Sequence, residues 1–139
     1  MQAKEVMSSN IRIIPSNTSI QAAAELMRQM DIGTLPVTEN GQIVGMLTDR
    51  DITIRAVAEG ADPGATPARD VMSRNVISCF EDQDARDVAN AMEQNKVRRV
   101  VVVNRKNEAI GLISVDDLAM HAETKALADE VVKQFSRHH

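Results

Sequence analysis

The sequence predicts an α/β (α+β) fold in which two duplicated β-α-β-β-α units are followed by a C-terminal helix. The first observation behind this prediction is an internal repeat, because EVMS at residues 5–8 returns as DVMS at residues 70–73. The second is that short apolar runs alternate with segments of helical periodicity in both copies. The third is a stretch rich in glycine and proline between the copies, which is typical of a linker. The resulting division is repeat 1 (5–59), a linker (60–69), repeat 2 (70–121) and a C-terminal helical tail (122–139).

The elements of repeat 1 follow from local patterns. Thr18 and Gln21 form a capping-box pattern, which indicates a helix start. Asn40-Gly41 strongly favours a hairpin turn, and Gly60 suits the cap at the end of a helix. The predicted elements, in order, are a strand at 11–14, a helix at about 18–30, strands at 35–38 and 42–47, and a helix at about 49–59.

Repeat 2 carries the same pattern. Its central strand, Val100–Val103, has no polar alternation, which indicates a strand buried on both faces. In the tail, apolar Leu127, Val131 and Phe135 recur every four residues, as on one face of an amphipathic helix. The predicted elements are a strand at 76–79, a helix at about 83–95, strands at 100–103 and 109–113, a helix from 115, and a further helix in the tail.

Composition and charge exclude several classes of function. The chain has 139 residues, a net charge of −4, no Trp or Tyr and only two Phe, so it lacks both the basic field and the aromatic platforms of nucleic-acid binders. Its apolar runs are far shorter than the roughly 20 residues of a membrane helix. The N-terminus lacks the apolar segment of a signal peptide. We therefore expect a cytoplasmic protein with no nucleic-acid or membrane partner, in which the lone Cys79 is a small buried hydrophobe.

The candidate site is a motif that occurs once in each repeat. GMLTDRDI at 45–52 has a twin, GLISVDDL, at 111–118. The pairs Thr48/Asp51 and Ser114/Asp117 fit the capping box, so one interpretation is that they only begin helices. The other is a ribose-phosphate site, because the pattern occurs twice at the end of a strand and a carboxylate can accept two hydrogen bonds from a ribose diol. The residues by themselves leave both interpretations open.

These features together resemble a tandem of CBS domains, named for cystathionine beta-synthase and often called a Bateman module. The resemblance rests on the duplicated unit, the DVMS-type entry, the LPV strand at 35–37 and the paired G-h-h-[T/S]-x-x-D ends, and it covers residues 5–121. The TDRDI stretch, Arg55 and the EG at 59–60 are similar to small bacterial proteins that consist of one such pair and little else. The resemblance implies a non-enzymatic regulatory module that needs no cofactor. Its ligand would be an adenosine compound, commonly AMP, ADP, ATP or S-adenosylmethionine, bound in clefts between the repeats and signalled to a partner protein. We expect AMP, ADP or ATP ahead of S-adenosylmethionine or NAD.

The resemblance also implies the site residues. The family's clefts are crossed, so that the motif of one repeat faces the first strand and the turn of the other repeat. The first cleft would contain Met46, Thr48, Arg50, Asp51, Ile77, Val97, Arg98 and Arg99. The second cleft would contain Arg12, Ile32, Gly33, Leu112, Ser114 and Asp117. We expect the second cleft to be the weaker one, because Asp116 stands where the first motif has Arg50.

Other interpretations stay open. A structural or protein-interaction module whose clefts no longer bind nucleotide is favoured by Asp116 and by the lack of adenine-stacking aromatics, whereas Arg50 and the basic stretch 96–99 favour the ligand sensor. No nucleophile or Gly-rich phosphate loop supports an enzyme. Arg55 is expected to form a surface pair with Asp51 four residues earlier.

Three further expectations concern metals, assembly and the C-terminus. We expect no metal site, because the histidines have no metal-ligand spacing. Apolar and small outer faces of the helices at 22–24 and 52–57 predict a homodimer. His138 and His139 are open to two interpretations, native residues or the trace of a purification tag.

Overall fold

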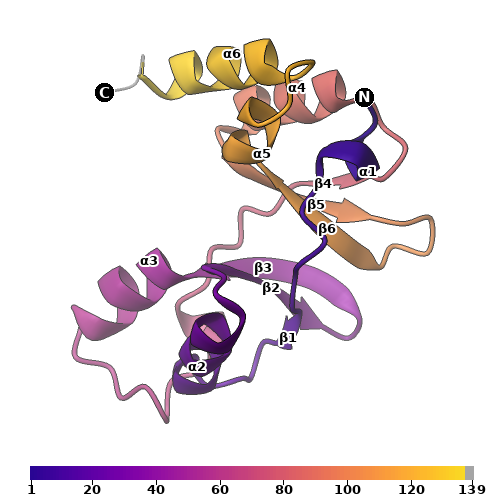
Figure 1. The fold of residues 1–139 in the computed structure, drawn as a ribbon. Coiled ribbons are helices and arrows are strands. Elements are labelled where there is room, and N and C mark those ends of the chain that lie inside the picture. Colours follow the sequence, from indigo (N-terminus) through magenta and orange to yellow (C-terminus); the bar gives the residue numbers. More distant parts are fainter. Residues whose placement is uncertain (137–139) are drawn as a thin grey trace. The chain divides into compact units, whose positions relative to one another are not determined.

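A computed structural model describes residues 1–136 of the protein; His138 and His139 lie outside the described residues. The chain divides into two compact units, each described by itself (Figure 1). The repeat-1 unit is Ile11–Val76. The repeat-2 unit combines Met1–Asn10 with the chain from Ile77 onward. No helix among the described residues has both the length and the apolar character needed to span a bilayer.

The repeat-1 unit is built around a three-stranded sheet of order β1-β2-β3, in which β1 runs parallel to β2 and β3 antiparallel to it. Its buried core includes Leu35, Val37 and Leu47 from the strands and Ile20 and Ala23 from the helix. Its elements are β1 (Ile14–Pro15), α2 (Ile20–Met30), β2 (Thr34–Glu39), β3 (Gln42–Thr48), α3 (Asp49–Asp51), a π-helical turn η1 (Ile52–Val57) and a 3₁₀ turn η2 (Ala68–Asp70).

The repeat-2 unit has the same sheet, of order β4-β5-β6, with a parallel and an antiparallel pair. Val100, Val101, Val102 and Val103 are all buried, which confirms the strand without alternation. Its elements are α1 (Ala3–Val6), β4 (Ser78–Phe80), α4 (Ala85–Asn95), β5 (Arg99–Val103), β6 (Ala109–Ser114), α5 (Val115–Ala119) and α6 (Lys125–Ser136). The predicted α/β (α+β) class, the two β-α-β-β-α repeats and the C-terminal helix are confirmed.

Several element boundaries differ from the prediction for physical reasons. Ser19, not Thr18, caps α2, because the Ser19 hydroxyl accepts a hydrogen bond from the Ala22 amide at 3.1 Å while the Thr18 carbonyl accepts one from Ala68. The first strand of each repeat begins later than expected: β1 starts at Ile14 and β4 at Ser78, where pairing with the central strand begins.

The helix expected at 49–59 is not one regular α-helix. After the three residues of α3 the chain widens into the π-helical turn η1, in which the Ala58 amide bonds to the Thr53 carbonyl at 3.0 Å. This i→i+5 bond is the signature of a π-turn. Gly60 then adopts a φ of 72°, as expected of a residue that ends a helix. The predicted Asn40-Gly41 hairpin turn is present, with φ values of 52° and 78°.

The segment that opens each repeat packs against the body of the other repeat. Ser8 exchanges two backbone hydrogen bonds with Leu112 of β6, and Ser73 does the same with Met46 of β3. Figure 1 accordingly shows indigo α1 beside the later-coloured elements of the repeat-2 unit. A Cβ on Gly111 would lie 2.9 Å from the Ser8 carbonyl oxygen, so the glycine of the motif makes room for this segment.

Candidate functional site

In the repeat-2 unit the candidate site begins where β6 ends and α5 starts. Asp117 accepts hydrogen bonds through Oδ2 from the Ser114 amide at 2.8 Å and from the Ser114 hydroxyl at 3.1 Å. The Asp117 amide in turn donates to the Ser114 hydroxyl oxygen at 3.1 Å. The capping-box interpretation is therefore realised in full. Within the described residues Oδ1 of Asp117 accepts no hydrogen bond, so half of the carboxylate is left for another partner.

The repeat-1 unit has the same arrangement between β3 and α3. Asp51 accepts a hydrogen bond through Oδ2 from the Thr48 amide at 2.9 Å, and the Asp51 amide donates to the Thr48 hydroxyl oxygen at 3.1 Å. No donor in the described part of the chain reaches Oδ1 of Asp51. Arg50 between them is exposed. Both copies of the motif therefore offer one carboxylate oxygen beside an ordered hydroxyl.

Within each unit the motif lies against the turn that precedes the central strand of its own repeat. The Val115 amide donates to the Arg98 carbonyl at 3.1 Å, and the Asp49 amide donates to the Gly33 carbonyl at 3.0 Å. A Cβ on Gly33 would come within 2.9 Å of an Asp49 carboxylate oxygen. The two turns differ in charge, because the second places Arg98 where the first has Gly33.

A pocket of about 150 Å³ opens at this place in the repeat-2 unit. Positive and negative groups, a hydroxyl and apolar side chains meet there: it is lined by Arg98, Arg99, Ser114, Val115, Asp116, Val132 and Phe135. The structure thus brings Arg98 and Arg99 together with Ser114, a residue that the sequence assigned to the other cleft. Asp117 anchors the same corner through its bonds to Ser114.

Sequence reasoning missed the contribution of α6 to this pocket. The four-residue spacing of Leu127, Val131 and Phe135 correctly indicated an amphipathic helix, but it carried no sign that Val132 and Phe135 reach the motif. The Arg98 guanidinium lies 4.5 Å from the centre of the Phe135 ring, within the range of a cation–π contact. An aromatic ring is therefore present at the site after all.

The other predicted site residues lie on defined elements of one unit or the other. In the repeat-1 unit, Met46 is buried on β3, Arg12 is exposed before β1, and Ile32 packs against the core just after α2. In the repeat-2 unit, the Ile77 carbonyl accepts a hydrogen bond from the Val101 amide at 2.9 Å. Leu112 is half-buried on β6, and Val97 is half-buried in the turn before β5, next to Arg98. Each predicted cleft combines residues of the two units. That these residues form one cleft therefore stays a prediction.

The expected surface pair of Arg55 with Asp51 is wrong. The Arg55 guanidinium instead donates to the carbonyl oxygens of Val71 and Met72, at 3.2 and 3.1 Å. The π-helical turn changes the helical spacing, so a side chain four residues after Asp51 does not follow the regular α-helical face. Arg55 consequently connects η1 to the DVMS segment at residues 70–73.

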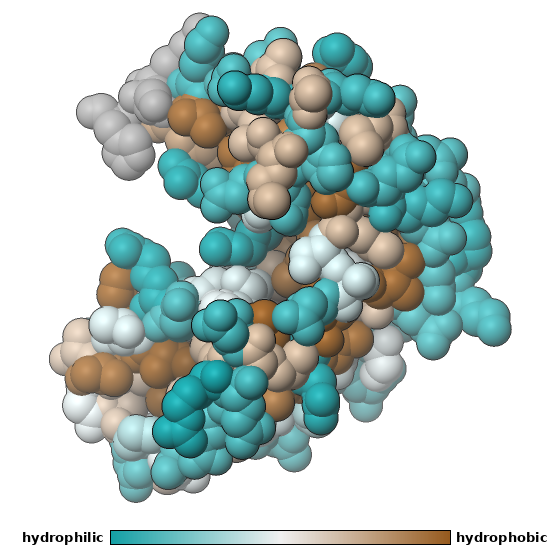
Figure 2. All heavy atoms as spheres, viewed as in Figure 1, coloured by the Kyte–Doolittle hydropathy of each residue, from teal (hydrophilic) through white to brown (hydrophobic). Residues whose placement is uncertain are grey.

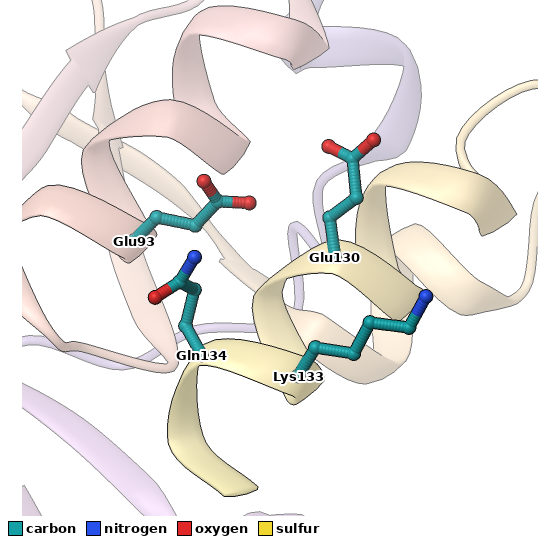
Figure 3. A pocket seen from close by; sticks show the side chains of 4 residues that line it. All are labelled: Glu93, Glu130, Lys133 and Gln134. Carbon is teal, nitrogen blue, oxygen red and sulfur yellow. The ribbon is translucent and has the colours of Figure 1, made fainter. Parts of the chain in front are cut away.

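A second hollow, of about 300 Å³, lies between α4 and α6 of the repeat-2 unit and is lined by Glu93, Glu130, Lys133 and Gln134. In Figure 3 Glu93 of α4 and Gln134 of α6 point toward one another. Across residues 1–136, no three His, Cys, Asp or Glu side chains converge as a metal would require. Cys79 is buried, as expected, and burial raises the pKa of its thiol to about 11, so the thiol is neutral near pH 7.

Comparisons with known proteins agree with the duplicated fold. The family model described as CBS domain matches residues 3–57 and 68–123. The chain is 35% identical over 133 residues to the CBS domain-containing protein YhcV of Bacillus subtilis, covering 96% of this chain and 94% of that protein. It is 31% identical over 130 residues to hypoxic response protein 1 of Mycobacterium tuberculosis, covering 93% and 90%. The CBS domain pair of protein MJ0100, solved with 5′-methylthioadenosine and S-adenosyl-L-methionine, is similar with a TM-score of 0.73 and 28% identity, covering 86% of this chain and 94% of that one.

Proposed function

The chain belongs to the CBS domain family, of which it carries two domains, and from this premise we propose that it is a non-enzymatic regulatory module. It binds an adenosine ligand at two hydroxyl–carboxylate boxes, which are Thr48 with Asp51 and Ser114 with Asp117, and it signals ligand binding to a partner protein. The observation that carries this proposal is the pocket of the repeat-2 unit, where the box formed by Ser114 and Asp117 lies beside Arg98 and Arg99.

The chemistry of this corner suits a ribose with a phosphate attached. Oδ1 of Asp117 can accept hydrogen bonds from the vicinal hydroxyls of a ribose, and such charge-assisted bonds are strong. The two guanidinium groups offer planar donor forks that match phosphate oxygens. A neutral sugar could be bound by neutral hydrogen-bonding groups alone. The two arginines therefore favour a ligand that carries a phosphate.

The class of ligand follows from the same charges. MJ0100 was solved with two ligands that share an adenosine group, which supports adenosine recognition in this family. S-adenosylmethionine carries a positive sulfonium centre, which Arg98 and Arg99 would repel. We therefore propose AMP, ADP or ATP as the ligand, ahead of S-adenosylmethionine or NAD.

The repeat-1 unit offers a second site of the same kind. Thr48 and Asp51 reproduce the box, and exposed Arg50 lies between them in the chain. The turn before β2 has Gly33 where repeat 2 has Arg98. The basic group of the first site is therefore Arg50, in the motif rather than in the turn. The family resemblance predicts a different grouping, in crossed clefts between the repeats, with Arg98 and Arg99 beside Asp51; that grouping remains a prediction.

Regulation requires that the ligand bind two states of the protein with different affinity. A ligand shifts an equilibrium only by its differential affinity for the two states, and the coupling is reciprocal. We propose that a separate partner protein responds to that shift in the cytoplasm, where the single buried thiol of Cys79 suits a reducing environment.

A thermal-shift series tests this proposal. A ligand that binds only the folded state adds RT ln(1 + [L]/Kd) to the free energy of unfolding, roughly 2.7 kcal/mol at 100 times Kd. We expect AMP, ADP or ATP to raise the melting temperature, and inosine or inorganic phosphate to raise it less. If none of the adenosine compounds, S-adenosylmethionine and 5′-methylthioadenosine included, changes the melting temperature at millimolar concentration, the structural or protein-interaction module becomes the better conclusion.

A further inference from the structure

The last turn of α6 lies on the pocket that contains Ser114. Val132 and Phe135 contribute to its lining, and the Phe135 ring lies 4.5 Å from the Arg98 guanidinium carbon. Arg98 is one of the two groups available there for a phosphate. The ring therefore holds a side chain that a nucleotide would need.

The last turn of α6 is held by fewer buried side chains than the rest of the helix. Leu127, Ala128 and Val131 are buried in the core of the repeat-2 unit, with exposures of 8%, 2% and 0%. Val132 is 46% exposed, and Phe135 is half-buried and packs against the edge of the same core. Helix ends with few buried contacts open at low free-energy cost. The final turn can thus leave its place while the first turns of α6 remain packed.

The size of the pocket indicates that this turn is an obstacle. Pockets that enclose small ligands measure about 300–1,000 Å³, whereas this one measures about 150 Å³ with Phe135 in place. We propose that the last turn of α6 is a built-in gate on the repeat-2 site, closed by the stacking of Phe135 on Arg98 and opened when a phosphate-bearing adenosine ligand binds Arg98. This inference rests on the proposed function and adds to it that Phe135 competes with the ligand's phosphate for Arg98.

The gate lowers the apparent affinity for the ligand. When only a fraction of molecules is competent to bind, the observed Kd rises by the inverse of that fraction. A partly exposed cation–π contact corresponds to roughly a two- to fivefold equilibrium constant. Loss of the stacking should therefore tighten ligand binding by roughly that factor.

Calorimetric titration of Phe135→Leu with ADP measures this effect. Leucine keeps an apolar side chain on the core but removes the aromatic face, so the protein should stay folded, which its melting temperature checks. We expect the Kd for ADP to fall roughly two- to fivefold relative to the wild type. An unchanged or raised Kd would overturn the gate, and a raised Kd would instead make Phe135 a platform for the base.

The chain offers a matched control. Phe80 carries Arg105 over its ring at 4.3 Å, and neither residue lines the pocket. Phe80→Leu removes the same kind of contact elsewhere in the repeat-2 unit and should leave the Kd for ADP unchanged. A gain of affinity in Phe80→Leu equal to that in Phe135→Leu would assign the effect to general loosening and would overturn the gate.

A second probe separates failure of the gate from failure of the proposed function. Pyrophosphate needs the arginines but no ribose or base, and we expect Phe135→Leu to bind it more tightly than the wild type does. If neither protein binds an adenosine ligand but the variant gains affinity for pyrophosphate, the gate stands and the proposed function fails. If pyrophosphate binds both equally, or neither, the gate is overturned.

Discussion

Asp51 and Asp117 each cap a helix, and we propose that each also binds a ribose, two roles that the sequence could not separate. One carboxylate oxygen of each residue accepts the amide of the hydroxyl residue three positions earlier, which fixes the start of a short helix. The other oxygen accepts nothing from the described residues. Helix capping and ribose binding are thus compatible, because they use different atoms. The cap also holds the carboxylate in one orientation, which lowers the entropic cost of binding a ligand.

Arg55 makes a contact that stabilises the repeat-1 unit. We expect Arg55→Ala to lower the free energy of unfolding by about 1–2 kcal/mol, because two backbone carbonyls beside buried side chains lose a charged donor. Urea denaturation measures this loss. Arg69→Ala is a suitable control, because Arg69 is exposed and its side chain makes no hydrogen bond or ion pair within residues 1–136; its effect should stay within about 0.5 kcal/mol.

A double-mutant cycle distinguishes this contact from the surface pair that the sequence predicted. If Arg55 paired with Asp51 on the surface, the effects of Arg55→Ala and Asp51→Asn would be coupled by about 0.2–0.5 kcal/mol. Since Arg55 bonds to Val71 and Met72 instead, we expect the two effects to add, with a coupling energy below about 0.2 kcal/mol. A larger coupling would restore the pair.

At the scale of the element, the regular parts of the fold were predictable because they depend on local patterns. Apolar spacing located α2 and α4, the unbroken apolar run gave buried β5, and Asn40-Gly41 gave the hairpin between β2 and β3. Boundaries that depend on competition between neighbours were not predictable. Ser19 caps α2 because the linker occupies the carbonyl of Thr18, which no local pattern indicates.

The candidate site was predictable only in part, for the same reason. Repetition of the motif identified Thr48, Asp51, Ser114 and Asp117, because a duplication in register is visible in the chain itself. The contribution of Phe135 was not visible, because it depends on where a distant helix packs. The π-helical turn was missed too, since its apolar pattern resembles that of an α-helix.

At the scale of the whole molecule, the exchange of the opening segments could not be read from the repeat. EVMS and DVMS stand at equivalent places whichever repeat body they contact. The structure assigns Ser8 to β6 and Ser73 to β3. Each unit is therefore completed by the start of the other repeat, so loss of residues 1–10 would remove part of the repeat-2 unit rather than of repeat 1.

Exposed apolar side chains predict association of two copies. Ile54 and Val57 of η1 are 45% and 64% exposed, and Figure 2 shows apolar surface over the end of the repeat-1 unit that carries α3. We expect a homodimer with a self-complementary contact through this helical face. Light scattering should give about twice 15.2 kDa, and Val57→Glu should lower that mass. A wild-type mass near 15.2 kDa at micromolar concentration would contradict the dimer.

Binding of an adenosine ligand by the two hydroxyl–carboxylate boxes is tested most directly by calorimetric titration of the wild type, Asp51→Asn, Asp117→Asn and the double variant with ADP. Asparagine still accepts the capping amide, and charge at a helix start is worth only about 0.3–1 kcal/mol, so the melting temperatures should change little. Each single variant should lose about tenfold or more in affinity, because a charge-assisted acceptor is worth about 1.5–3 kcal/mol, and the double variant should lose the most. The relative losses of the single variants rank the two sites by affinity. Asp116 disfavours a phosphate at the second motif, whereas Arg98 in the turn of repeat 2 favours one there. Reduced stability of the unliganded variants together with unchanged affinity for ADP would contradict the binding role and leave both motifs as helix caps.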